Sequence, residues 1–194
     1  MTTNESNHRI KLIHQIRDAY GNVVYTERTQ LEQHLYLEKL NKGIKYFQII
    51  LSAISTVGFI GAVVNDEVVA VWIGGVFAAL LLATNLFFKD FNIMSDMNQH
   101  RKTADELWSI KEQYKSLLTD FDSLSESAII QKRDELQFQT SDVYKNMLKT
   151  GKRPFKLAQK ALKVNKESFF SDDELNRLLP SHLRLSDTSE ENKV

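Results

Sequence analysis

The sequence predicts an all-α membrane protein, in which a two-helix transmembrane hairpin continues into a cytoplasmic antiparallel helical stalk with additional C-terminal helices. Two uncharged runs, residues 46–65 and 68–88, are separated only by Asp66 and Glu67. As a helix, each run is about 30 Å long, which matches the hydrocarbon core of a bilayer. Two prolines and seven glycines in 194 residues suit a mostly helical chain, and the absence of cysteine excludes disulfides and Cys-ligated metals.

The average composition hides the hairpin. The chain has 25 basic and 25 acidic residues, and its mean hydropathy of −0.33 is typical of a soluble protein. Zero net charge argues against binding to a nucleic acid polymer. The alternative to a hairpin is a pair of buried core helices in a soluble protein. The remainder of the chain is too polar to bury two adjacent helices that are apolar on all sides, which favours the membrane.

The first part of the chain, residues 8–45, is predicted to form cytoplasmic helices. Apolar residues recur about one helical turn apart at Ile10, Ile13, Ile16 and Tyr20. Gly21-Asn22 is expected to end this short helix. A second helix is expected to begin near Thr26 and to run without a break into transmembrane helix 1, residues 46–64.

Transmembrane helix 2 is expected at residues 68–88, and the flanking charges predict the orientation of the hairpin. The basic residues next to the two spans are Lys39, Lys42, Lys45, Lys89, Arg101 and Lys102. The turn between the spans carries only acidic residues. By the positive-inside rule, both termini are therefore expected in the cytoplasm and the turn outside.

Residues 91–185 are predicted to form the rest of the cytoplasmic helical region. Apolar residues at helical spacing follow span two, at Met97, Ala104, Leu107, Tyr114, Leu117 and Phe121. This stripe predicts a helix that continues span two as one rod of about 55 residues. The rod is expected to pair with the N-terminal helix as an antiparallel stalk.

Capping signals predict the last helices. One helix is expected from about Ser125 to Thr150, with Gly151 as its C-cap, and Pro154 is expected in the first turn of the next. A short final helix is expected to start at Ser171 and to end before Pro180. Residues 1–185 are then a single domain, and the polar tail 186–194 is expected to be disordered.

Small residues recur four apart in both spans and predict close helix packing. They are Gly58 and Ala62 in span one, and Gly74, Gly75, Ala78, Ala79 and Ala83 in span two. Small side chains let helix backbones approach each other in lipid. The pattern fits packing within one hairpin and packing between copies of the chain.

Uncharged polar residues in the spans are candidates for lining a pore. Gln48, Ser52 and Ser55 fall on one face of span one, and Asn85 is expected at the depth of Gln48. Such groups line water or hydrogen-bond another helix, and serine often bonds a carbonyl of its own helix. Two helices cannot enclose a channel, so a pore requires a homo-oligomer.

The segment from Val143 to Lys166 carries eight basic residues and no acidic one. The candidate anion-binding residues are Lys149, Lys152, Arg153, Lys156, Lys160 and Lys163. Three interpretations stay open: a solvated face, attraction to anionic membrane lipid, or a site for a phosphate-bearing ligand.

No enzyme and no cofactor are predicted. The five histidines lack metal-ligand spacing, and the paired glycines lie inside the spans rather than in a phosphate-binding loop. His100 falls on the apolar stripe that follows span two, where a packing role is expected.

The order of these features resembles the SLATT family, the two-transmembrane effector domains of bacterial nucleotide-signalling conflict systems. The resemblance covers residues 8 to 185. It rests on VVYTERTQLEQHLYLEKLNKGIKYFQIILSAISTVGFIGAVV leading into span one and on HRKTADELWSIKEQYKSLLTDF after span two. It also rests on KRDELQFQTSDVYKNM and on RPFKLAQKALKVNKESFFSDDELNRLLPSHLRL. The run DELNRLLP after a lysine-rich helix is the most characteristic part.

The resemblance implies an antiviral defence effector in the bacterial inner membrane. Such a protein is proposed to oligomerise and permeabilise the membrane, causing cell death or dormancy, when infection activates a partner. The implied partner is a nucleotidyltransferase or its cyclic nucleotide product. The family brings no catalytic motif, and the chain shows no SLOG-type sensor domain. The alternative function is a membrane scaffold, without a pore, that docks a cytoplasmic enzyme at the bilayer.

Overall fold

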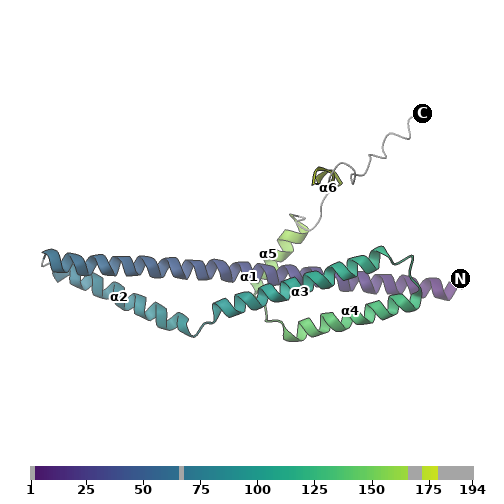
Figure 1. Ribbon diagram of the computed structural model, residues 1–194, viewed down its shortest axis with the longest axis horizontal. Helices are drawn as coiled ribbons and strands as arrows, with labels where there is room; N and C mark the ends of the chain where they lie inside the picture. The colour runs from purple at the N-terminus through teal and green to yellow at the C-terminus, as the bar shows by residue number, and fades with distance from the viewer. Residues whose placement is uncertain (1–2, 66–67, 166–171, 179–194) are drawn as a thin grey trace, which may run out of the picture.

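The computed structural model describes residues 3–65, 68–165 and 172–178, and every regular element in these ranges is a helix (Figure 1). The helices are α1 (Thr3–Asn65), α2 (Val68–Lys89), α3 (Ile93–Thr119), α4 (Glu126–Asn146), α5 (Lys152–Lys163) and α6 (Asp172–Leu178). The side chains of residues 3–6, 62–65, 172–173 and 176 are not among those described. The expected acidic turn, the start and end of the last helix at Ser171 and Pro180, and the tail 186–194 lie outside the described residues.

The longest helix, α1, extends over 63 residues without interruption, about 95 Å. The predicted break at Gly21-Asn22 is therefore wrong. Ile16 and Val23, on either side of Gly21, are both fully buried in the same core. Burying such side chains contributes about 1.5–3 kcal/mol each, which exceeds the roughly 1 kcal/mol that glycine costs inside a helix.

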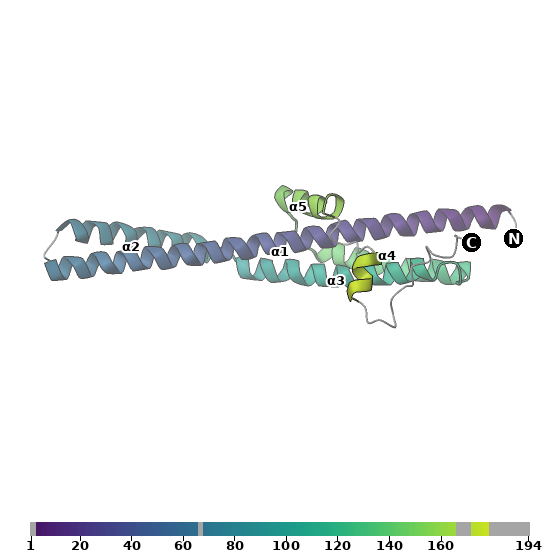
Figure 2. The ribbon, with the colours of Figure 1, turned by 90° about the horizontal axis from the view of Figure 1, so that it is seen from above.

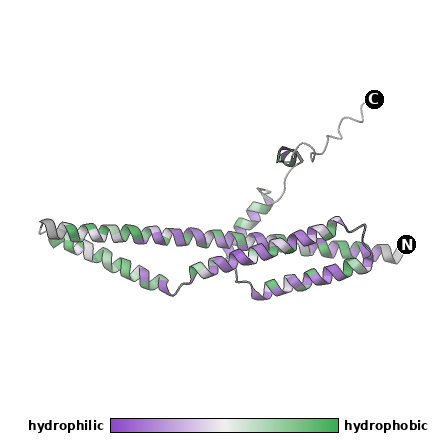
Figure 3. Cartoon of the chain, viewed as in Figure 1, coloured by the Kyte–Doolittle hydropathy of each residue, from purple (hydrophilic) through white to green (hydrophobic). Residues whose placement is uncertain are grey.

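The predicted hairpin is present, formed by the second half of α1 and by α2, which return antiparallel to each other (Figure 1). Both helices are long and apolar enough to cross a membrane. Figure 3 shows that apolar residues dominate this end of the molecule, whereas polar residues dominate the other. Only 6% of the most apolar stretch of α2 is buried within the protein, so α2 is not a core helix of a soluble domain.

A bend separates α2 from α3, and the predicted uninterrupted rod after span two is wrong. The helix ends at Lys89 and resumes at Ile93, with Asn92 as the N-cap of α3. Asparagine is favoured at this position because its side chain competes with helical backbone bonds. The ring of Phe91 packs against Phe88 at 6.1 Å between centroids, and an aromatic cluster covers the bend.

The predicted antiparallel stalk is confirmed, and α4 adds a third helix to it (Figure 1). Its core contains side chains from α1, α3, α4 and the segment between α3 and α4: Leu12, Ile16, Val23, Leu107, Ile110, Tyr114, Leu117, Phe121, Ile129 and Leu136. The predicted apolar stripe is buried from Ala104 to Leu117 in α3 and at Phe121 just after this helix. Ile10, in contrast, is 52% exposed, and Leu12 takes the core position instead.

Capping residues define where α4 and α5 begin. The expected start of α4 is confirmed, because the hydroxyl of Ser125 accepts a hydrogen bond from the Ala128 N–H at 3.3 Å. The helix ends at Asn146, however, and Gly151 is the N-cap of α5 rather than the C-cap of α4. Pro154 lies in the first turn of α5, as predicted. Figure 2 shows α5 beside α1, against which it packs.

Candidate functional site

The backbones of the two spans approach closely at Gly58 of α1 and Gly74 of α2. A Cβ atom added to Gly58 would lie 2.8 Å from the Gly74 Cα and 3.1 Å from the Ala70 carbonyl oxygen. A Cβ added to Gly74 would lie 3.2 Å from the Ser55 carbonyl oxygen. Only glycine fits at such backbone contacts, so this pair determines the distance between the two helices.

The other small residues of the spans lie in different surroundings. A Cβ added to Gly75 would have no atom within 4 Å, and Ala79 and Ala83 are exposed on the same stripe. Ala78 is partly buried, and the side chain of Ala62 lies outside the described residues. The stripe of Gly74 and Ala78 therefore faces α1 at Gly74, whereas the stripe of Gly75, Ala79 and Ala83 points away from α1.

The structure brings three of the four candidate pore residues into contacts within the hairpin. The Gln48 side-chain amide donates to the Asn85 side-chain oxygen at 2.9 Å, which confirms that the two lie at the same depth. The buried hydroxyl of Ser55 donates to the Gly74 carbonyl at 3.2 Å. Ser52 is exposed. These bonds tie the two spans together inside one copy, and the pore-lining role stays a prediction about the oligomer.

A layer of buried polar side chains lies between the stalk core and the hairpin. The Gln30 side chain is 1% exposed, accepts a 2.5 Å hydrogen bond from His100 Nδ1 and donates to the Leu148 carbonyl at 3.1 Å. His34 Nδ1 donates to the Met97 carbonyl at 3.0 Å. Gln30 therefore connects α1 with α3 and with the segment between α4 and α5.

Sequence reasoning missed Gln30 and the layer around it. The residue lies seven positions after Val23 and fourteen after Ile16, so it continues the buried face of α1. That spacing was visible in the sequence, but a polar side chain at a core position gives no hydropathy signal. The packing role predicted for His100 agrees with its burial and its hydrogen bond to Gln30.

Burial makes the stability of this layer dependent on pH. Desolvation lowers the pKa of His100 below its ordinary value of 6.5, an effect that His34 reinforces and Asp96 opposes. The unfolded chain therefore takes up a proton before the folded chain does as the pH decreases. We expect the contribution of His100 to stability to be complete above about pH 6.5 and to be lost as the pH falls further.

Denaturant unfolding of the full chain between about pH 7.5 and pH 5 measures this effect. The parent protein should lose stability on acidification, and His100→Gln should lose less because its side chain does not ionise. The introduced glutamine still offers an N–H donor to Gln30. The difference in stability between the two proteins at about pH 7.5 therefore measures the packing lost with the imidazole, and the difference between their pH slopes measures the effect of His100 protonation. Equal pH slopes in the two proteins would contradict the assignment.

The predicted basic residues surround α5 and all are exposed: Lys149, Lys152, Arg153, Lys156, Lys160 and Lys163. Pro154, Ala158 and Ala161 bury the opposite face of α5 against α1. The Arg153 guanidinium lies 5.5 Å from the ring centroid of Tyr36, and the Lys163 ammonium lies 6.0 Å from that of Tyr25. Among the described residues, none of the six basic side chains forms an ion pair with a carboxylate.

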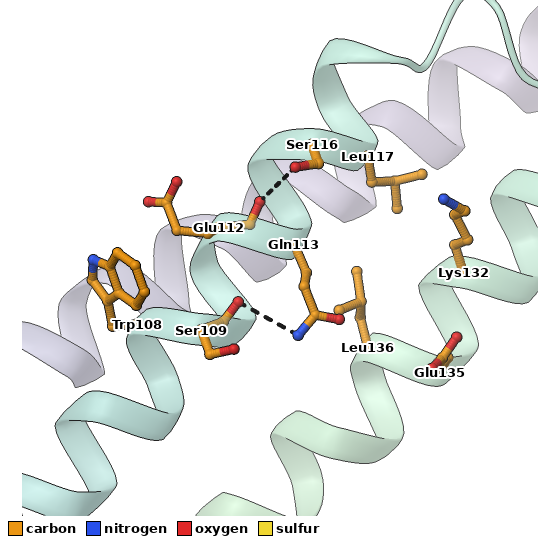
Figure 4. Close-up of a pocket in the computed structure, with 9 residues that line it drawn as sticks. All are labelled: Trp108, Ser109, Glu112, Gln113, Ser116, Leu117, Lys132, Glu135 and Leu136. Atoms are coloured by element: carbon orange, nitrogen blue, oxygen red, sulfur yellow. Dashed lines mark hydrogen bonds between the residues drawn. The ribbon is translucent and has the colours of Figure 1, made fainter.

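Of the cavities along the stalk, two are lined by both an aromatic residue and a lysine but not by the core residue Tyr114. One, of about 400 Å³, is formed by α1, the segment between α4 and α5, and the first turn of α5. The other, of about 360 Å³, lies between α3 and α4 and includes Trp108 and Lys132 (Figure 4). In the second cavity, Gln113 and Ser116 donate to carbonyls of their own helix.

Comparison with known proteins identifies the family. The model of the SMODS and SLOG-associating 2TM effector domain family 4 matches residues 12–174, from the N-terminal half of α1 into α6. Searches of curated proteins and of solved structures found no match. The match spans most of the 194 residues and confirms the SLATT resemblance, and the two spans that the family name requires are the apolar helices of the hairpin. The chain is a membrane protein and belongs to the SMODS and SLOG-associating 2TM effector domain family 4.

Proposed function

We propose that this protein is the membrane effector of a bacterial nucleotide-signalling defence system and permeabilises the inner membrane as a homo-oligomer. The observation that carries the proposal is a hairpin of two apolar helices joined to a long helical stalk, in a family of two-transmembrane effector domains. The protein acts without chemistry of its own, and membrane lipid and further copies of the chain are its direct partners. A nucleotidyltransferase, or its cyclic nucleotide product, provides the signal.

Several features support assembly into an oligomer. Two helices cannot surround a water-filled channel, so further copies must contribute. The stripe of Gly75, Ala79 and Ala83 points away from α1 and leaves room for a neighbouring helix. An apolar groove of about 470 Å³, which includes Val57 and Gly61, lies on the surface of the hairpin.

The orientation is part of the proposal. Basic residues flank the base of the hairpin, and the turn carries Asp66 and Glu67. We propose spans at 46–64 and 68–88, both termini in the cytoplasm, and one domain over residues 1–185. The stalk then projects into the cytoplasm, where a soluble signal reaches it.

Dye release from liposomes tests the proposal. The full chain is reconstituted into vesicles of phosphatidylethanolamine and phosphatidylglycerol and assayed with and without cyclic nucleotides, and release of an entrapped dye is expected in at least one of these conditions. Replacing Gln48 and Ser52 together by leucine should slow release about tenfold, equivalent to a barrier about 1.4 kcal/mol higher. Polar groups that line a channel stabilise water within it, and leucine does not.

Matched controls come from the same spans. The hydroxyls of Thr56 and Thr84 donate to Ser52 and Leu80 carbonyls of their own helices, so Thr56→Val and Thr84→Val should leave release unchanged. Unchanged dye release in the double leucine variant would contradict the proposal that Gln48 and Ser52 line the pore. Vesicles that stay sealed under all conditions, while expression of the chain is still toxic to cells, would contradict a pore and favour the scaffold.

A further inference from the structure

The cavity beside α5 combines flat rings with positive charge. Tyr25 of α1 and Phe155 of α5 contribute aromatic rings to its wall, and Phe155 is 50% exposed. Lys149 lines the same cavity, and the Lys163 ammonium lies 6.0 Å from the ring centroid of Tyr25. Its volume of about 400 Å³ is within the usual range for small-molecule sites.

Each of these groups recognises a different part of one class of ligand. Exposed aromatic rings stack on the flat bases of nucleotides, and each stacked base is typically worth about 1–3 kcal/mol. Lysine ammonium groups bind phosphate oxygens through charge-assisted hydrogen bonds. One buried polar residue, Gln30, also contributes to the lining.

Charge distinguishes this cavity from the groove between α3 and α4. That groove also offers an aromatic ring and a lysine, Trp108 and Lys132, but the carboxylates of Glu112 and Glu135 line it as well (Figure 4). Carboxylates repel a phosphate group. The cavity beside α5 has no carboxylate among the described residues of its lining, and the sequence has no acidic residue from Val143 to Lys166.

We propose that the cavity formed by α1, the α4–α5 segment and α5 binds a nucleoside phosphate. The base stacks on Tyr25 and Phe155, and the phosphate lies between Lys149 and Lys163. This inference deepens the proposed function and rests on it for the biological role of the ligand, since it assigns the place where a nucleotide signal is received. The hydrogen bond from Gln30 to Leu148 connects the site to α1 and, through His100, to α3.

Isothermal titration calorimetry on the full chain in detergent micelles tests the site. The probes are the four ribonucleoside 5′-monophosphates, their 3′,5′-cyclic forms, cyclic dinucleotides of adenosine and guanosine, and inorganic phosphate. We expect at least one nucleotide to bind more tightly than inorganic phosphate. For that nucleotide, Phe155→Ala should weaken binding by at least about fivefold through lost stacking. Lys149→Gln and Lys163→Gln should each weaken it by a similar factor.

The control variants change the same residue types elsewhere. Trp108→Ala and Lys132→Gln alter the groove between α3 and α4, and Lys160→Gln removes a lysine from α5 away from the cavity. All three should change the dissociation constant by less than about twofold. Helix content and thermal stability equal to those of the parent would show that Phe155→Ala has folded. Lys149→Gln tests the site independently, because an exposed lysine can be replaced without disturbing the fold.

Two results would overturn the inference. In the first, no nucleotide binds more tightly than inorganic phosphate. In the second, Lys160→Gln weakens binding as much as Lys163→Gln while Phe155→Ala has no effect, as for a diffuse basic surface that attracts anionic lipid. If nucleotide binds in this cavity but the vesicles stay sealed, the nucleotide site is supported and the proposed pore is contradicted. If dye is released but no nucleotide binds, the pore is supported and the nucleotide site is contradicted.

Discussion

Gly58→Ala is expected to push the two spans apart and to destabilise the hairpin by about 1–3 kcal/mol. The new methyl group would lie 2.8 Å from the Gly74 Cα and 2.9 Å from the Gly74 nitrogen. These are backbone atoms, so no side chain can rotate to make room. The helices must separate, and the Ser55 hydrogen bond to Gly74 and the Gln48 bond to Asn85 lengthen with them.

Two glycines of the same hairpin provide controls with the opposite sign. A Cβ on Gly75 would contact nothing within 4 Å, and one on Gly61 would lie 3.9 Å from the Ala70 Cβ, an ordinary contact. Alanine is favoured over glycine in a helix by up to about 1 kcal/mol. Gly75→Ala and Gly61→Ala should therefore leave the stability of a single hairpin unchanged or raise it.

Spin labels measure the separation directly. The chain has no cysteine, so Val57→Cys and Val76→Cys create the sole labelling sites, at positions that are 69% and 55% exposed. The distance between the labels should increase in Gly58→Ala and stay constant in Gly75→Ala. Unfolding of the same proteins in mixed micelles of increasing SDS content gives the change in stability. A constant label distance together with parental stability in Gly58→Ala would contradict the close approach.

Tyr114→Ala is expected to cost about 3–5 kcal/mol of the stability of the stalk. Tyr114 is fully buried where α3 meets α1 and α4, in one core with Val23, Leu117 and Leu136. Removing its ring leaves a cavity at the centre of the three-helix core. The surrounding helices are long and packed along their length, so they close such a cavity only in part.

The hydroxyl of the same residue provides an internal comparison. It is buried, and no group in the described part of the chain has good hydrogen-bond geometry with it; the Thr140 hydroxyl lies close by but donates to the Leu136 carbonyl. Tyr114→Phe should therefore be neutral or stabilise the protein by up to about 1 kcal/mol, because it removes an unpartnered polar group and keeps the ring. Denaturant unfolding followed by tryptophan fluorescence measures both variants. Equal losses in Tyr114→Phe and Tyr114→Ala would show that the hydroxyl, and not the ring, is essential.

Burial also predicts an alkaline effect at this position. Desolvation raises the pKa of Tyr114 above its ordinary value of 10.0. Above about pH 10 the unfolded chain loses this proton before the folded chain does, so the contribution to stability is complete below that pH and is lost as the pH rises. Tyr114→Phe should lack this part of the alkaline decrease in stability.

Much of the fold could be predicted because its signals are local. Uncharged runs of about 20 residues predicted both spans, and apolar spacing predicted the buried stripe of α3 from Ala104 to Leu117. The errors were at helix ends. Gly21 was expected to break α1, but packing of its neighbours overrides the local preference. The bend at Asn92 was missed because apolar residues continue on both sides of it.

The candidate site was less accessible to sequence reasoning. The basic residues of α5 were identified from charge alone, but the cavity beside them requires Tyr25, which lies 130 positions before Phe155. Gln30, His100 and Leu148 likewise meet from three separate segments. No spacing rule links residues so far apart, because their contact depends on how the helices pack.

The sequence by itself determined that the protein is helical, that two adjacent runs are apolar enough to span a membrane, and which family it belongs to. These properties follow from composition and periodicity along one segment at a time. Only the tertiary structure decided which glycine of each span meets the other helix, where a polar layer replaces the apolar core, and which lysines adjoin a cavity. Those features depend on the distance and rotation between helices, and these are set by the combined packing of side chains that are remote in the sequence.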